Sequence, residues 1–258
     1  MNVITSRDNP LIKELRRLSQ DSTAYRKLGR VWLEGDHLCR AALTRGVKPE
    51  QAVFAESLWA SAQRDWVQAA AHITVLPDAL FAEISSLESP AKMGFILTAP
   101  ASLDMRLTLP TVVLDRVQDA GNVGSILRSA SAFGFKQVLA IKGSAALWSP
   151  KVLRAGMGAH FGLHLVEGLS GDDLDALEMP WFATSSHHGP FLHTLLAEAQ
   201  LPMPCAWLMG HEGQGVSAAL AERATLHVRI AQPGGEESLN VASAAAICLH
   251  ASATCHLR

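Results

Sequence analysis

The stretch that decides the fold runs from Leu226 to His250: LHVRI at 226–230, AQPGGEE at 231–237 and SLNVASAAAICLH at 238–250. Its first segment alternates apolar and polar residues, which predicts a half-buried strand, and its last segment predicts an alanine-rich helix that opens at Ser238. The proline and glycines between them predict an irregular loop. Free N–H groups at such a helix N-terminus favour an anionic or carbonyl ligand, but an ordinary connection with Ser238 as N-cap explains the stretch equally well.

The same alternation of strands and helices recurs upstream. In the first hundred residues, strands are predicted at 31–35, 51–56, 73–77 and 93–100, with helices at 10–20, 37–46, 57–71 and 78–87. Beyond them, strands are predicted at 111–115, 137–141, 163–167, 181–185 and 205–210, again with helices between them. This alternation implies α/β units with largely parallel sheets.

A boundary between two domains is expected near residue 100. A length of 258 residues slightly favours two domains over one. The segment APASLDMRLTLP at 99–110 is bracketed by prolines and is typical of a linker. We therefore expect a smaller α/β domain at 1–100, a linker at 101–109 and a second α/β domain at 110–258.

Charge is distributed unevenly along the chain. The formal net charge of −2 argues against a protein that coats nucleic acid without specificity. Residues 1–30, however, carry seven basic and three acidic side chains and a net charge of +4, so the remainder sums to −6. A phosphate-contacting arm and a solvated helix face explain this basic segment equally well.

Several classes of protein are disfavoured by composition. No apolar run approaches the roughly 18 residues of a membrane span, and the N-terminus lacks the apolar core of a signal peptide, so a cytoplasmic location is expected. The four cysteines form no metal-like spacing with histidine, so we expect reduced, mostly buried thiols and no metal site. With only 15 aromatic residues, a stacking platform for single-stranded nucleic acid is also disfavoured.

Two further loops follow predicted strands, where open α/β sheets usually bind ligands. In DAGNVGSILRSA at 119–130, Asn122 can cap a helix, and Arg128 nearly two turns later is either a phosphate clamp or a surface arginine. The loop MGHEGQGVS at 209–217 has no lysine in the Walker position, so it is not a P-loop for nucleoside triphosphates. Its carboxylate, Glu212, could face a cation or a hydroxyl.

Taken together and in this order, three segments resemble the signature motifs of one enzyme family. NVGSILRSASAFG from 122, LMGHEGQGVS from 208 and IAQPGGEESLNVASAAAI from 230 are similar to those of the SpoU (TrmH-like) RNA ribose 2′-O-methyltransferases of the knotted SPOUT class. The likeness covers roughly residues 108–258. ITSRDNPLIKEL from 4 and LEGDHL from 33 are similar to the ribosomal protein L30e-like substrate-binding domain of members that modify rRNA.

The resemblance implies a C-terminal α/β trefoil-knot domain that binds S-adenosyl-L-methionine, an N-terminal L30e-like domain, and a homodimer in which both subunits contribute to each site. The substrate would be RNA, rRNA rather than tRNA, with no DNA or membrane partner. The residues that would form the catalytic surface are Asn122, Arg128, Glu212, Ser238 and Asn240. The residues that would bind the cofactor are Gly210, Gly213, Ile230, Gln232, Leu239 and Asn240.

The chemistry of ribose methylation suits these residue types. A 2′-hydroxyl is a poor nucleophile until it loses its proton, so the enzyme must position it in line with the methyl group and assist proton loss. Since the ordinary pKa of arginine lies far above neutral pH, Arg128 is expected to hold the substrate phosphate rather than act as a free base. The alternatives are a tRNA 2′-O-methyltransferase, a knotted enzyme that methylates a base nitrogen, and a non-catalytic RNA-binding or ribosome-assembly factor.

Overall fold

A computed structural model describes residues 1–101, 104–235 and 238–256 of the protein. The chain divides into two compact units: Met1–Ala101 with Trp148–Phe161, and Ser102–Leu147 with Gly162–Arg258. The domains expected from sequence are continuous, whereas the first unit includes a segment from the second half of the chain. Residues 102–103 of the expected linker lie outside the described residues.

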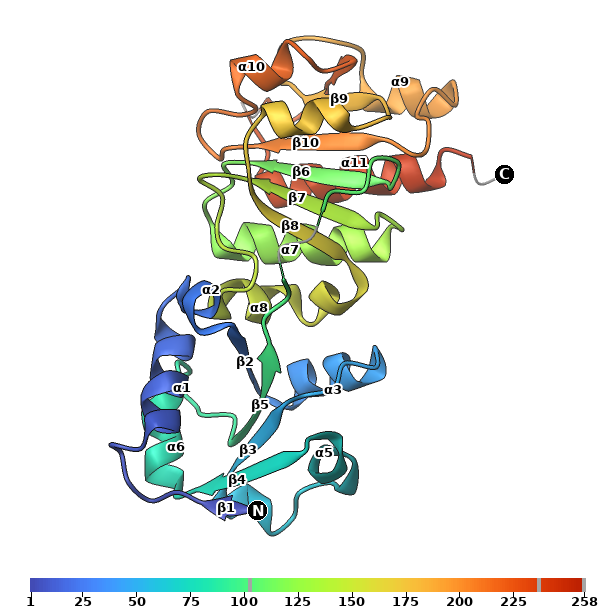
Figure 1. The fold of residues 1–258 in the computed structure, drawn as a ribbon. Coiled ribbons are helices and arrows are strands. Elements are labelled where there is room, and N and C mark those ends of the chain that lie inside the picture. Colours follow the sequence, from blue (N-terminus) through green and yellow to red (C-terminus); the bar gives the residue numbers. More distant parts are fainter. Residues whose placement is uncertain (102–103, 236–237, 257–258) are drawn as a thin grey trace. The chain divides into compact units, whose positions relative to one another are not determined.

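The first unit is built on a five-stranded sheet in the order β1-β4-β3-β5-β2 (Figure 1). Its strands are β1 (Asn2–Val3), β2 (Arg30–Glu34), β3 (Gln51–Ala55), β4 (His72–Leu76) and β5 (Met93–Thr98). Its helices are α1 (Pro10–Gln20), α2 (Ala24–Leu28), α3 (Asp36–Thr44), α4 (Glu56–Trp59), α5 (Arg64–Ala69), α6 (Asp78–Ile84) and α8 (Pro150–Gly156). The 3-10 turn η1 (Ala159–Gly162) follows α8 at the boundary with the second unit. The single helix expected at 57–71 is therefore two short helices, α4 and α5.

The prediction of a largely parallel sheet is wrong for one strand of this unit. β4 runs parallel to β1 and to β3, but β5 lies between β2 and β3 and is antiparallel to both. An apolar pattern predicts that a segment is a strand and which residues face the core, but it carries no information on strand direction.

Helix α1 shows how the sequence specifies its own ends. Asn9 is the N-cap, and its side chain accepts a hydrogen bond of 2.9 Å from the backbone N–H of Leu11. Proline at the first helical position needs no N–H partner. Ile12, Leu15 and Leu18 are buried as their spacing predicts.

The second unit is a six-stranded, wholly parallel sheet in the order β11-β9-β10-β6-β7-β8. Its strands are β6 (Thr111–Asp115), β7 (Gln137–Ile141), β8 (His164–Leu169), β9 (Trp181–Thr184), β10 (Ala206–Gly210) and β11 (Leu226–Val228). Its helices are α7 (Ala120–Ala132), α9 (Leu192–Ala197), α10 (Ala218–Ala221) and α11 (Val241–Thr254), with a 3-10 turn η2 (Asp172–Ala176). The parallel sheet expected here is thus present.

Small residues let helix α11 pack closely. It contacts helix α7 and strand β10 (Figure 1), and it buries Ala245, Cys248 and Ala251 in doing so. Within this packing, the buried indole N–H of Trp207 on β10 donates a hydrogen bond of 2.9 Å to the hydroxyl of Ser252. Among the described residues, no helix is long and apolar enough to cross a membrane.

Candidate active site

The three motif loops leave the same edge of the second sheet. β6 and β10 are neighbouring parallel strands whose last residues, Asp115 and Gly210, lie side by side. Because the carboxyl ends of parallel strands meet at one edge, the loops that follow β6, β10 and β11 emerge together. The fold therefore brings together the loops that lead to Asn122, Glu212 and Asn240.

The first loop ends in a cap that differs from the expected one. Asp119, not Asn122, is the N-cap of α7, because its carboxylate accepts a hydrogen bond of 2.7 Å from the backbone N–H of Asn122. The side chain of Asn122 is consequently available for other partners. Its amide Nδ2 donates a hydrogen bond of 3.1 Å to the carboxylate of Glu212.

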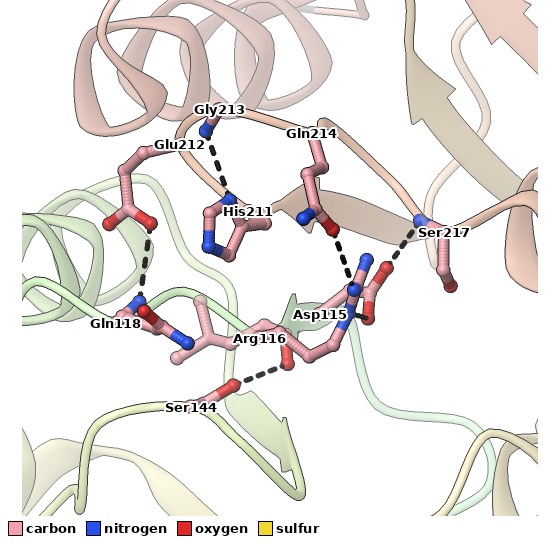
Figure 2. Close-up of polar contacts among 10 residues, drawn as sticks. Asp115, Arg116, Gln118, Ser144, His211, Glu212, Gly213, Gln214 and Ser217 are labelled. Atoms are coloured by element: carbon pink, nitrogen blue, oxygen red, sulfur yellow. Dashed lines mark hydrogen bonds and ion pairs between the residues drawn. The ribbon is translucent and has the colours of Figure 1, made fainter.

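Glu212 is held by the first loop through three donors. Besides the Asn122 amide, one oxygen accepts from the backbone N–H of Gln118 at 3.3 Å (Figure 2). The other accepts from the backbone N–H of Asp119 at 3.1 Å. Burial works to raise the pKa of this carboxyl, but the hydrogen bonds outweigh it and hold the pKa of Glu212 below its ordinary value. Glu212 is therefore an ionised acceptor at neutral pH.

The third loop joins the same network. Asn240 is the N-cap of α11, with its side-chain oxygen accepting from the N–H groups of Ala242 at 2.9 Å and Ser243 at 3.2 Å. Its Nδ2 donates a hydrogen bond of 2.9 Å to Oδ1 of Asn122. The expected N-cap at Ser238 is thus wrong, and the helix begins three residues later at Val241.

The structure gathers only part of the expected catalytic surface. Asn122, Glu212 and Asn240 form one hydrogen-bonded chain. Arg128 and Ser238 are exposed, and neither takes part in the hydrogen bonds that connect Asn122, Glu212 and Asn240. Arg128 lies on α7, less than two turns beyond Asn122. The catalytic roles of all five residues stay predictions.

A second network, at the end of β6, was not foreseen from the sequence. The buried carboxylate of Asp115 accepts from the N–H of Ser217 at 2.5 Å and from Nε of Arg116 at 3.0 Å. Arg116 in turn donates from Nη1 to the amide oxygen of Gln214 at 3.1 Å (Figure 2). The only signal in the sequence is an aspartate that ends an apolar strand, followed directly by an arginine.

The loop between β10 and α10 is closed by its own backbone. His211 and Gly215 exchange two backbone hydrogen bonds of 3.0 and 2.8 Å. The backbone of this turn approaches Gly210 so closely that a Cβ there would lie 2.0 Å from the carbonyl carbon of Gly215. The imidazole Nδ1 of His211 accepts from the N–H of Gly213 at 3.0 Å (Figure 2). Only glycine fits at position 210.

The expected cofactor residues occupy this edge in different environments. Gly210 is buried, Ile230 and Gln232 are half-buried, and Leu239 and Gly213 are exposed. The side-chain oxygen of Gln232 is buried without a hydrogen-bond partner among the described residues. Residues 236–237 of the third loop lie outside the described residues. These cofactor assignments stay predictions.

The chain is similar in sequence to known RNA methyltransferases. Residues 110–250 match the family model described as the SpoU rRNA methylase family, and residues 9–94 match an MRM3-like substrate-binding domain. The chain is 30% identical to the 23S rRNA (guanosine(2553)-2′-O)-methyltransferase RlmP of Bacillus subtilis, with 100% of both chains covered.

Two solved structures extend the similarity to the fold. A crystal structure of an RNA 2′-O ribose methyltransferase superposes with a TM-score of 0.80 at 30% identity, covering 99% of this chain and 100% of the other. The rRNA methyltransferase from Sinorhizobium meliloti, solved with bound AdoMet, has a TM-score of 0.83 at 27% identity, covering 100% of this chain and 98% of the other.

Proposed function

The chain belongs to the SpoU rRNA methylase family, and we propose that it transfers the methyl group of S-adenosyl-L-methionine to a ribose 2′-hydroxyl of rRNA. The α/β SPOUT fold with an N-terminal substrate-binding domain, expected from the sequence, is confirmed. The observation that carries the proposal is the hydrogen-bonded chain of Asn122, Glu212 and Asn240, because it connects all three motif loops at one edge of the sheet.

The residues at this edge fit the cofactor. S-adenosyl-L-methionine supplies a methyl group on a sulfonium, which is electrophilic without further activation. The buried amide oxygen of Gln232 lacks a partner among the described residues, and a buried acceptor of this kind favours a ligand with N–H donors. Gly210, Gly213, Ile230 and Leu239 would complete the pocket, mainly through their backbone.

The network defines what its members do for the substrate. Glu212 accepts from Asn122 and from two backbone N–H groups, so it fixes the first loop rather than removing a proton. Asn122 and Asn240, held to each other, present a fixed polar surface beside Ser238 on which the ribose is oriented. Arg128 holds the phosphate of the target nucleotide and favours the developing alkoxide electrostatically.

The enzyme acts as a homodimer in the cytoplasm, on RNA and not on DNA. Support for a partner subunit comes from the exposed apolar side chains of Leu239 and Ile247, which are 38% and 42% exposed. Both lie at or near α11, close in sequence to the proposed ribose surface. A second subunit that covers them would also complete the site around the exposed Arg128.

One experiment tests the function directly. Total RNA from a strain that lacks the enzyme is incubated with the protein and labelled S-adenosyl-L-methionine, and the modified position is mapped. We expect label in rRNA, in an alkali-resistant linkage; label in tRNA or on a base nitrogen favours the corresponding alternative. Arg128→Ala should abolish methylation with cofactor binding nearly intact. Calorimetry that detects no cofactor binding to the wild-type protein contradicts the enzymatic function.

A further inference from the structure

Three planar side chains are stacked on the surface of the second unit. The ring of Phe191, at the N-cap of α9, is 36% exposed. The guanidinium carbon of Arg229 lies 4.1 Å from the centroid of this ring. The exposed ring of His193 is stacked on it with a centroid separation of 5.4 Å and an interplanar angle of 20°. Together Phe191, His193 and Arg229 form a stack in which the two rings are exposed and Arg229 is half-buried.

The backbone holds this stack in place. Arg229 donates from its N–H to the carbonyl of Pro190 at 2.9 Å and from Nε to the carbonyl of Gly189 at 2.8 Å. Leu192 donates back to the carbonyl of Arg229 at 2.8 Å. Gly189 lies so close to β11 that a Cβ at position 189 would be 1.8 Å from the carbonyl oxygen of His227. The exposed rings are therefore preorganised, which reduces the entropic cost of binding a ligand on them.

The stack lies at the edge of the sheet that carries the candidate active site. It follows the carboxyl ends of β9 and β11, and β9 is the strand next to β10. Since neighbouring strands are about 4.8 Å apart, the end of β9 lies about 10 Å along the edge from the end of β6. Arg229 also directly precedes Ile230, in the expected wall of the cofactor pocket.

The charge around the stack selects the kind of ligand. Residues 179–197 and 223–235 contain no aspartate or glutamate. The exposed His187 and His188 precede the stack, in a turn that is closed by hydrogen bonds from their N–H groups to the hydroxyl of Ser185 at 3.2 and 3.1 Å. A surface that combines aromatic rings, a guanidinium and imidazoles suits a base and its phosphate.

We propose that Phe191, His193 and Arg229 form a stacking platform for one unpaired base of the RNA substrate, next to the nucleotide that is methylated. This inference rests on the proposed function and adds a subsite to it. The low aromatic content of the chain does not oppose it, because a single base needs only one or two rings. Sequence-specific recognition of RNA commonly uses unstacked bases of this kind.

The test compares variants of the full-length protein with rRNA from a strain that lacks the enzyme. Phe191→Ala should raise KM for the RNA about tenfold, in keeping with the contribution of one stacked base. The Kd for S-adenosyl-L-methionine should stay unchanged. Phe191→Tyr should retain the wild-type KM, while Phe191→Leu, which preserves apolar contacts but not the ring, should not. Met203→Ala is the matched control, since Met203 is equally exposed at 36% and lies before the opposite, amino end of β10.

Salt dependence gives an independent readout. Stacking releases few counterions, so Phe191→Ala should weaken RNA binding without changing the slope of log Kd against log salt. The proposal is overturned if the KM for RNA is unchanged, if Phe191→Leu behaves as the wild type, if cofactor affinity falls instead, or if Phe191→Ala dissociates the dimer. A wild-type protein that does not methylate RNA would contradict the proposed function itself, which is a separate result.

Discussion

Asn240 donates a hydrogen bond of 2.9 Å to Asn122, which precedes it by 118 residues. Asn240 also caps α11, and Asn122 also binds Glu212. One amide pair therefore connects the N-termini of two helices and a third loop. Because each side chain uses both its donor and its acceptor, a change in either one alters the position of two motif loops.

Replacing Asn122 with aspartate should reveal this dependence. The substitution keeps the shape of the side chain but removes the donor to Glu212 and places a second negative charge beside that carboxylate. A misplacement of about 1 Å at a reacting centre costs on the order of 100-fold in rate, so kcat should fall by roughly that factor. Single-turnover methylation measures the effect. Ser125→Ala is the control, because Ser125 is exposed on the same helix. If Asn122→Asp methylates as fast as this control, the hydrogen bond from Asn122 to Glu212 does not set the rate.

The helix caps show where inference from the sequence ends. Asp119 and Asn122 are both good N-cap residues within one turn, as are Ser238 and Asn240, and their intrinsic preferences are nearly equal. The choice at each helix depends on a partner distant in the sequence: Asn122 binds Glu212 and Asn240 instead of capping its own helix. The motifs thus identified the family and the loops, but only the fold determines which side chains meet.

The hydrogen bonds of Asp115 and Arg116 could not be predicted from the sequence, for the same reason. A single aspartate at the end of a strand carries no periodic signal, and its partners Gln214 and Ser217 lie about a hundred residues away. The strand β5 was located correctly, but its antiparallel direction depends on where the chain returns to the sheet. Local patterns predict elements, and long-range pairing decides their orientation.

The pH dependence of activity should not originate from Glu212 near neutrality. The pKa of this group in the folded protein lies below its ordinary value of 4.5. Its contribution to the loop network is therefore fully present above pH 4.5 and is lost as the pH falls through the lower, folded-state pKa. Between about pH 6 and 9 the dependence of kcat/KM on pH should keep its shape in Glu212→Gln, even if the value of kcat/KM falls at every pH. A limb of the profile that disappears in this variant would show that Glu212 titrates during catalysis.

Three of the four thiols should be inert in the folded protein. All four cysteines are free and buried, as expected from the sequence. Burial raises the pKa of Cys205 to about 12 and also raises the pKa of Cys39 and Cys248, which leaves almost no reactive thiolate at neutral pH. A chromogenic disulfide reagent should leave these three unmodified in the native protein and modify all four cysteines in urea. Rapid native labelling of Cys39, Cys205 or Cys248, located by peptide mapping, would contradict this burial.

Arg116 has a left-handed backbone, with φ at +60°, a conformation that costs a residue with a side chain roughly 1 kcal/mol. Its side chain joins Asp115 to Gln214 and so secures the loop that carries Glu212. Arg116→Ala removes the side chain and keeps the backbone cost, whereas Arg116→Gly removes both. Both variants should therefore weaken cofactor binding by a similar factor in calorimetry.

In urea denaturation, the glycine variant of Arg116 should be more stable than the alanine variant by about 1 kcal/mol. At an ordinary backbone position the order is reversed, because glycine costs about 0.5 to 1 kcal/mol relative to alanine. A more stable alanine variant would rule out the left-handed strain. A large difference in cofactor affinity between the two would mean that the backbone at position 116, rather than the guanidinium, controls the loop.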